Sequence, residues 1–226
     1  MKLSIIIPCY NEISTIEKIV EKIKKNYKDI HEIIIVDDFS TDGTRQKIQN
    51  LNVDRVIYNS SNCGKGFSIR KGIEQASGDI ILIQDADLEY EPQDYYKLIA
   101  PIKEGSADVV YGSRFVGSSQ KRVLFFWHRV FNYFLTLLSN MFTNLNLTDM
   151  ECGYKLFKHD VIKNINLKEN RFGFEPEITA KISKLDIKIY EVGVQYHGRD
   201  YSQGKKITWK DGIAAVYCIF KYNLFK

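Results

Sequence analysis

Three carboxylates follow an apolar run of the sequence at alternate positions. Asp85, Asp87 and Glu89 come after residues 79–83, and an extended segment would aim all three toward one side. Like charges this close repel one another, so a bound cation would stabilise the arrangement. Carboxylate oxygens suit Mg²⁺ or Mn²⁺ rather than zinc. The spacing predicts a divalent metal site able to bridge the phosphates of a nucleotide diphosphate, with a solvated acidic loop as the alternative.

Two further polar clusters follow apolar runs in the first half of the chain. Residues 8–12 read Pro-Cys-Tyr-Asn-Glu, and residues 37–40 read Asp-Asp-Phe-Ser. Taken singly, such residues are more often helix caps or turn formers. If the apolar runs are strands of one sheet, however, all three clusters meet at its carboxyl edge, where ligands of open α/β sheets bind.

The elements that must position these clusters alternate between strand and helix. Short β-branched runs predict strands at residues 3–7, 32–36, 55–58, 79–83 and 108–111, and apolar residues at helical spacing predict helices at 12–27, 41–51, 65–76 and 92–102. This alternation predicts an α/β fold with a mostly parallel sheet covered by helices on both faces.

The second half of the chain is less regular. We expect an aromatic helical stretch at residues 121–142, a turn-like segment at 149–157, a helix at 175–184, a strand at 187–192 and an amphipathic helix at 207–225. No linker separates the halves, and a chain of 226 residues can bury one sizeable core. A single domain over residues 1–226 is therefore expected.

Four motifs occur in an order and at positions typical of one enzyme family. Residues 6–12 read Ile-Ile-Pro-Cys-Tyr-Asn-Glu, 36–44 Val-Asp-Asp-Phe-Ser-Thr-Asp-Gly-Thr, 62–66 Asn-Cys-Gly-Lys-Gly and 85–89 Asp-Ala-Asp-Leu-Glu. Together they resemble the family 2 glycosyltransferases, and within that family the dolichol-phosphate mannosyltransferase-like and polyprenyl-phosphate sugar transferases. Four ordered motifs are far more specific than any one of them.

The resemblance implies a fold and a reaction. The expected fold is GT-A, a single Rossmann-like sheet with amphipathic C-terminal and interfacial helices, in which residues 1–115 bind the nucleotide sugar and 116–226 the acceptor. The expected reaction is inverting transfer of a sugar from a nucleotide-diphosphate sugar to a polyprenyl or dolichyl phosphate, with Mg²⁺ or Mn²⁺ as cofactor. A saccharide or other hydroxyl acceptor in cell-surface polysaccharide synthesis is the alternative.

The resemblance also assigns roles to individual residues. Asp37 is expected to read the base or ribose, and Asp85 and Asp87 to serve the metal and the diphosphate. Glu89 is expected as a third metal ligand, at a position where this branch often carries Gln. The expected nucleotide-sugar-binding set is Pro8, Tyr10, Glu12, Asp37, Lys65 and Asp85.

Basic residues follow the fifth strand and precede the last helix. Arg114 lies after residues 108–111, and Arg199, Ser202 and Lys205 belong to a segment that resembles the family's Arg-Tyr-Ser-x-Gly-Lys-Lys. Arginine offers a bidentate fork and lysine a point charge, so these groups suit an acceptor phosphate or the departing diphosphate. A solvated basic turn is the alternative reading. His197, beside Arg199, is a further candidate for phosphate contact.

Asp149 stands where relatives with hydroxyl acceptors carry a general base. An alcohol must lose its proton to attack, whereas a lipid phosphate is already a nucleophilic oxyanion, so Asp149 would then only position other groups. The expected catalytic set is Asp87, Arg114, Asp149 and Arg199.

Residues 123–135 are rich in aromatics but are interrupted by His128, Arg129 and Asn132. A spanning helix needs about 20 predominantly apolar residues, whereas a basic aromatic helix can lie among lipid head groups. We expect an interfacial helix with one face packed on the core, and core packing of all its aromatics is the alternative.

Composition limits the remaining classes. A net charge of +4 gives no case for nucleic-acid binding, and the four cysteines lack CxxC pairing, which fits a reducing cytosol. We expect a cytoplasmic protein, peripheral at the cytoplasmic face of the membrane, with a membrane protein as a further candidate partner. A nucleotidyltransferase would carry a glycine-rich loop after the first strand, where residues 8–11 read Pro-Cys-Tyr-Asn. An inactive sugar-binding or scaffold subunit is disfavoured because the Asp85 and Asp87 pair is present together with Arg114 and Arg199.

Overall fold

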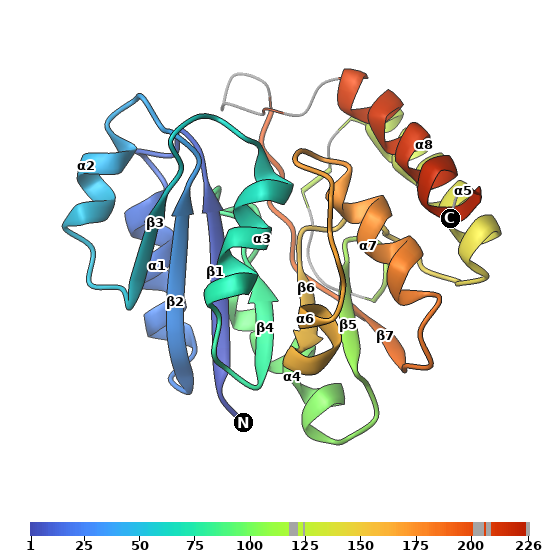
Figure 1. The fold of residues 1–226 in the computed structure, drawn as a ribbon, viewed down its shortest axis with the longest axis horizontal. Helices are drawn as coiled ribbons and strands as arrows, with labels where there is room; N and C mark the ends of the chain where they lie inside the picture. Colours follow the sequence, from blue (N-terminus) through green and yellow to red (C-terminus); the bar gives the residue numbers. More distant parts are fainter. Residues whose placement is uncertain (118–121, 124, 201–205, 207–208, 225–226) are drawn as a thin grey trace.

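The computed structural model describes residues 1–117, 122–123, 125–200, 206 and 209–224. At its centre lies a seven-stranded sheet with the order β3-β2-β1-β4-β6-β5-β7 (Figure 1). Six strands run parallel and β6 runs antiparallel to both of its neighbours. The mostly parallel sheet expected from the sequence is confirmed. The strands are β1 (Leu3–Cys9), β2 (Ile30–Asp37), β3 (Arg55–Tyr58), β4 (Ile80–Ile83), β5 (Val109–Ser113), β6 (Lys155–Lys158) and β7 (Ile189–Gly193).

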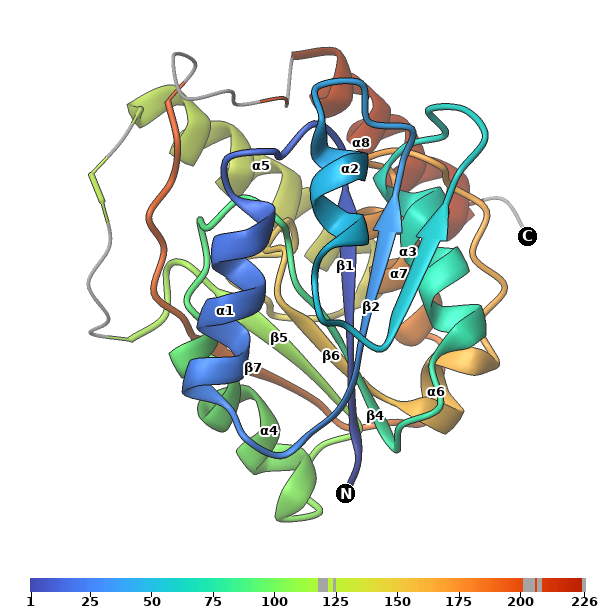
Figure 2. The same ribbon diagram turned by 90° about the vertical axis from the view of Figure 1, so that its left-hand side faces the viewer.

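Helices cover both faces of the sheet, as Figure 2 shows, because the strands are apolar on both sides. Buried residues of α1 and α4 pack on one face, and those of α3, α6 and α7 pack on the other. Ile16, Ile19 and Ile23 of α1, for example, recur at helical spacing and are fully buried. The helices around the sheet are α1 (Ile16–Asn26), α2 (Thr44–Gln49), α3 (Lys65–Gln75), the 3₁₀ turn η1 (Pro92–Asp94), α4 (Tyr95–Lys103), α6 (His159–Lys163) and α7 (Phe174–Ile182).

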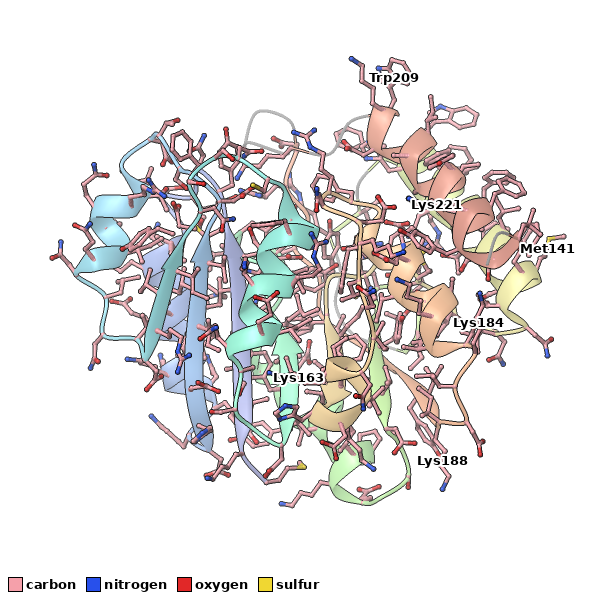
Figure 3. All side chains as sticks on the ribbon, in the orientation of Figure 1. Met141, Lys163, Lys184, Lys188, Trp209 and Lys221 are labelled. Carbon is pink, nitrogen blue, oxygen red and sulfur yellow. The ribbon has the colours of Figure 1, made fainter. Side chains whose placement is uncertain are left out.

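Two further helices, α5 (Phe126–Thr143) and α8 (Trp209–Leu224), lie outside α7 and contact each other. Both present large apolar side chains to solvent. Trp127 is 74% exposed, Met141 73% and Trp209 70%, and Figure 3 shows Trp209 and Met141 pointing away from the body of the molecule. Among the described residues, no helix is both long enough and apolar enough to span a bilayer.

One segment differs from the sequence-based expectation. Residues 149–157 were expected to be turn-like, but residues 155–158 form β6, which lies between β4 and β5. Lys155 at its start is fully buried, and its ammonium group donates to the carbonyls of Met150, at 3.0 Å, and Cys152. A buried lysine is tolerated here because these backbone carbonyls satisfy its protons.

Candidate active site

A cavity of about 420 Å³ opens at the carboxyl ends of the strands, the size of a typical small-molecule site. The register of the sheet places Cys9 opposite Asp37 and Ile6 opposite Ile83, so the segments after β1, β2 and β4 meet there. Residues of both halves of the chain line it. Those predicted from the sequence are Pro8, Tyr10, Glu12, Lys65, Asp85, Asp87, Glu89, Arg114 and Arg199.

Each of the three strand-end segments contains a non-glycine residue in the left-handed conformation. Asn11 has φ 50°, Phe39 φ 65° and Leu88 φ 64°. Such residues are uncommon and, for a bulky side chain such as Leu88, costly unless the surrounding structure holds them. Residues 85–89 therefore form a turn, in which the Glu89 amide donates to the Asp87 carboxylate at 3.1 Å, and the expected extended segment is wrong.

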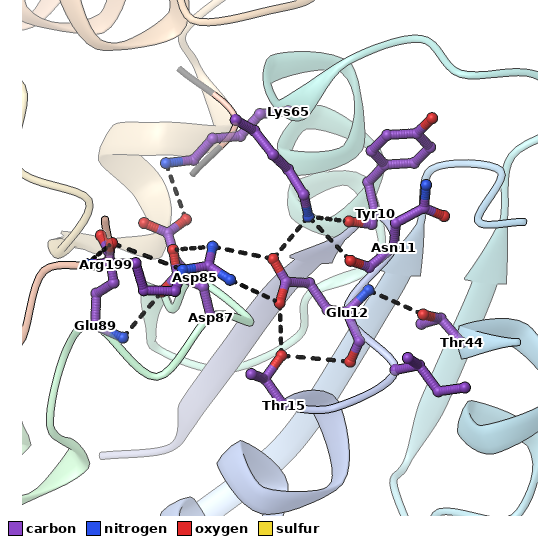
Figure 4. Close-up of polar contacts among 12 residues, drawn as sticks. Tyr10, Asn11, Glu12, Thr15, Thr44, Lys65, Asp85, Asp87, Glu89 and Arg199 are labelled. Carbon is purple, nitrogen blue, oxygen red and sulfur yellow. Dashed lines mark hydrogen bonds and ion pairs between the residues drawn. The ribbon is translucent and has the colours of Figure 1, made fainter. Parts of the chain in front are cut away.

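Arg199 lies between the acidic clusters that follow β1 and β4 (Figure 4). Its guanidinium donates to both carboxylate oxygens of Glu12, at 3.1 and 3.2 Å, and to Asp87 at 3.2 Å. Lys206 adds a second cation, 2.7 Å from Glu12. Arg199 and Lys206 thus both line the cavity and compensate its carboxylates.

Both carboxylate oxygens of Glu89, expected as a third metal ligand, accept hydrogen bonds from residues 196–199. One oxygen accepts from the Arg199 backbone amide at 2.7 Å and the other from the Tyr196 hydroxyl at 3.0 Å. Within the described part of the chain, no group of three or more His, Cys, Asp or Glu side chains is placed to hold a metal ion.

The electrostatic surroundings of Asp87 nevertheless favour a bound cation. Burial, together with the charges of Glu89 and Asp85, raises the pKa of Asp87 to about 7, although Arg199 opposes the shift. Such repulsion is relieved by a cation. Mg²⁺ commonly binds one or two carboxylates together with substrate phosphates, so the oxygen-only pair of Asp85 and Asp87 fits a divalent ion that arrives with a diphosphate.

Lys65, at the first position of α3, joins two carboxylates from distant elements. Its ammonium lies 2.9 Å from Asp85 and 3.1 Å from Glu175 of α7. Burial by itself lowers the pKa of Lys65, but the two carboxylates outweigh burial and the pKa is raised, so the group stays charged. The lysine thus neutralises part of the charge at the cavity floor.

Arg114 is fixed by Asp149, which is completely buried. Asp149 accepts from Nε and a terminal nitrogen of Arg114 at 2.6 Å each, from the Arg114 amide at 2.9 Å and from Asn132 at 2.9 Å. Arg114 lines the cavity and Asp149 does not. With its oxygens committed to four donors, Asp149 positions Arg114 and is poorly placed to take a proton from an acceptor.

Asp37 is also turned away from the cavity. It is fully buried and forms an ion pair with Arg45 at 2.6 Å. The neighbouring Asp38 lines the cavity instead, and it accepts hydrogen bonds from the amides of Cys63 and Gly64 at 2.9 and 2.7 Å. Asp38 therefore fixes residues 63 and 64, which lead into α3 and Lys65.

The cavity also contains residues that the sequence did not single out, among them Tyr90, Tyr196, Glu151, Arg171 and Glu175. Tyr90 directly follows the motif at residues 85–89, and Glu151 lies two residues after Asp149, but neither position was assigned a role from the sequence. His197 lies 3.9 Å from Glu91 and does not line the cavity. Ser202 and Lys205, expected at the acceptor phosphate, lie outside the described residues.

Comparison with known sequences identifies a family. Residues 4–165 match the family model described as Glycosyl transferase family 2. The chain is 30% identical over 233 residues to a dolichol-phosphate mannosyltransferase of Pyrococcus furiosus, covering 99% of this chain and 65% of that protein. It is 26% identical over 213 residues to a dodecaprenyl-phosphate galacturonate synthase of Rhizobium johnstonii, covering 91% and 62%. The chain thus spans less than two thirds of the length of these two relatives.

Comparison with solved structures supports the fold. The chain superimposes on glucosyl-3-phosphoglycerate synthase from Mycobacterium tuberculosis, determined with Mn²⁺, UDP-glucose and phosphoglyceric acid, with a TM-score of 0.79. The match covers 100% of this chain and 80% of that one at 17% sequence identity. The GT-A fold expected from the motifs is confirmed.

Proposed function

The chain belongs to glycosyl transferase family 2, and from this premise we propose that it transfers a sugar, with inversion, from a nucleotide-diphosphate sugar to a polyprenyl or dolichyl phosphate. The observation that carries the proposal is one cavity lined both by the acidic pair Asp85 and Asp87 and by two arginines, Arg114 and Arg199. The acidic pair suits a donor diphosphate with its metal, and the guanidinium groups suit a second phosphate.

On the donor side, residues 1–115 supply most of the groups. Pro8, Tyr10 and Glu12 line the end of the cavity that follows β1, and Asp38 and Lys65 line the part next to α3. We assign the nucleotide to this region and its diphosphate to the neighbourhood of Lys65 and Asp85, because a buried cation there would offset the diphosphate charge. Asp37 would act on the nucleotide indirectly, by positioning Arg45 and the loop at residues 37–40.

The metal would be held by Asp85 and Asp87. When bound, a Mg²⁺ or Mn²⁺ ion there would stabilise the negative charge left on the nucleotide diphosphate as the sugar departs. Arg199 compensates Asp87 and Glu12, and with a divalent cation held at Asp87 its guanidinium would be available to an incoming phosphate. Glu89 would then act through Arg199 and Tyr196, which it holds by hydrogen bonds.

On the acceptor side, the state of Asp149 favours a phosphate. A hydroxyl acceptor needs a base, and Asp149 is buried behind Arg114 with four donors on its oxygens. A phosphate oxyanion attacks without a base, so orientation and charge compensation by Arg114 and Arg199 would supply most of the barrier reduction. Names of relatives that act with dolichol phosphate and dodecaprenyl phosphate agree with this acceptor class.

The exposed faces of α5 and α8 support an acceptor at a membrane surface. Phe126 is 68% exposed, Trp127 74% and Trp209 70%. Exposed aromatics on helices of this kind favour the head-group region, and exposed apolar patches mark interaction surfaces. A peripheral position at the cytoplasmic face, reached through these helices or a membrane-protein partner, completes the proposal.

The function is tested by incubating the protein with a panel of nucleotide sugars and Mg²⁺ or Mn²⁺, with polyprenyl phosphate or soluble hydroxyl acceptors, and measuring release of nucleotide diphosphate. Turnover should require a lipid phosphate. Release that depends on a soluble hydroxyl acceptor and ignores polyprenyl phosphate would refute the lipid-phosphate acceptor.

The membrane position is tested with anionic liposomes. Replacing Phe126 and Trp127 by Ser should weaken binding while nucleotide binding persists, because side chains this exposed contribute little to the core. Tyr96, which is 57% exposed on α4, offers a matched control, since Tyr96→Ser removes an exposed aromatic from the other face of the sheet. Equal liposome binding by the double variant and the control variant would contradict the proposed orientation.

A further inference from the structure

Two carboxylate oxygens at the cavity have no hydrogen-bond partner. Within the described residues, Oε1 of Glu151 and Oε2 of Glu175 are both shielded from solvent and unpaired, although both residues line the cavity. Glu175 is only 3% exposed. A buried acceptor without a donor costs about 1–3 kcal/mol, so these two groups are poised for a ligand that brings hydrogen-bond donors.

Glu177, the next glutamate of α7 after Glu175, is a buried carboxylate with a purely structural role. Glu177 is fully buried, yet its oxygens accept from the amides of Lys168 and Glu169 at 2.7 Å each and from Lys181. Glu177 does not line the cavity. The two carboxylates of α7 therefore differ in a specific way: the one away from the cavity is satisfied and the one at the cavity is not.

The unpaired oxygens lie next to the proposed diphosphate and metal site. Lys65 joins Glu175 directly to Asp85. The segment that carries Glu151 also abuts Asp85, since a Cβ on Gly153 would lie 2.1 Å from an Asp85 oxygen. A group attached to a diphosphate held at Asp85 would therefore be close to both glutamates.

The chemistry of the two groups defines the ligand. Carboxylate oxygens accept hydrogen bonds from hydroxyls and repel other carboxylates. Burial and the charge of Glu175 raise the pKa of Glu151 to about 8, so Glu151 carries its proton at neutral pH and can donate as well as accept. The pair can thus recognise adjacent hydroxyls of a sugar ring.

We propose that Glu151 and Glu175 form the subsite for the sugar ring of the donor and select an uncharged hexose over a uronic acid. This inference rests on the proposed function, because it takes the diphosphate to lie at Asp85. It assigns the sugar contacts to the loop before β6 and to α7, which the four sequence motifs do not include.

The test compares the free diphosphate with the sugar-bearing donor, so that effects on diphosphate binding cancel. The dissociation constants of UDP, UDP-glucose, UDP-glucuronate, GDP and GDP-mannose are measured by calorimetry with Mn²⁺ for the wild type, Glu175→Gln and Glu151→Ala. Glu177→Gln is the matched control, and Glu151→Gln restores hydrogen bonding without the titrating group.

The ratio of the affinity for the hexose donor to that for its diphosphate should fall about tenfold in Glu175→Gln and Glu151→Ala, the effect of one hydrogen bond to a charged or strongly polar group. Glu151→Gln and Glu177→Gln should keep the wild-type ratio. If Glu175→Gln does not fold, Glu151→Ala still decides the question. An unchanged ratio in every folded cavity variant, or tighter binding of UDP-glucuronate than of UDP-glucose by the wild type, would overturn the subsite. Failure of the wild type to bind any of the five compounds would instead overturn the proposed function.

Discussion

Replacing Asp149 by Asn should destabilise the protein strongly. Asp149 is completely buried and accepts three hydrogen bonds from Arg114 and one from Asn132, at 2.6–2.9 Å. Breaking a buried ion pair by removing one partner costs about 3–5 kcal/mol. Because the Arg114 side chain is 18% exposed, we expect the lower end, about 3 kcal/mol. For a chain of this length, that corresponds to a fall in Tm of roughly 6–12 °C.

The assay is thermal unfolding of Asp149→Asn beside a matched surface variant. Asp108→Asn also removes a carboxylate that pairs with a cation, Lys158 at 2.7 Å, but both side chains are partly exposed. Its expected cost is about 1 kcal/mol or less. Turnover should fall in Asp149→Asn and in Arg114→Ala, and the double variant should be no worse than the poorer single variant, because both changes remove the same placement of Arg114.

The opposite pattern of stability and turnover would give Asp149 a different role. If Asp149→Asn melts with the wild type but loses turnover, the carboxylate acts in chemistry, and a hydroxyl acceptor with Asp149 as base becomes the better account. Additive losses in the double variant would show that Asp149 and Arg114 act separately.

Three further predictions follow from the charges around the cavity. Activity should require Mg²⁺ or Mn²⁺ and be lost in excess EDTA, and full activity in EDTA would contradict this. The Asp87→Ala variant should lose most turnover while remaining folded. Arg199→Ala should lower turnover and Arg199→Lys should rescue it only in part, because lysine cannot contact Glu12 and a phosphate bidentately; wild-type rates in the Ala variant would remove Arg199 from the reaction. The pKa of Glu151 is raised from 4.5 to about 8. Between these two pH values the folded protein binds a proton that the unfolded chain has released, so the free energy of unfolding of the wild type falls as pH rises toward about 8. Glu151→Gln should therefore melt higher than the wild type at about pH 9, with the gap closing toward about pH 5; a constant gap would contradict the shift.

Local sequence patterns predict most strands and helices of the fold, and the strand that they miss, β6, is missed for a physical reason. Strands such as β1 and β4 are continuously apolar because helices cover both faces, so periodicity and composition predict them. The β6 strand has only four residues, Lys-Leu-Phe-Lys, and lysine normally indicates exposure. Carbonyls of Met150 and Cys152 satisfy Lys155 in the interior, and no sequence pattern predicts that tertiary arrangement.

The candidate site was predictable where a motif follows a strand. Glu12, Asp85 and Asp87 end up together because parallel strands bring their carboxyl ends to one edge. Orientation was not predictable. Asp37 turns to Arg45, and the left-handed Leu88 converts an expected extended segment into a turn.

The position of β6 also bears on how the chain folds. This strand inserts between β4 and β5, so in residues 1–115 alone the sheet β3-β2-β1-β4 would end at β4 with an unpaired edge, and β5 would lack its neighbour. Unpaired edges template association with other chains, and pairings between segments far apart in the sequence form slowly because loop closure precedes them. A fragment ending near residue 115 should therefore aggregate when it is expressed alone. Assembly of the sheet centre must wait until the β6 segment has left the ribosome, so the β4 edge stays unpaired while residues 84–158 are being synthesised.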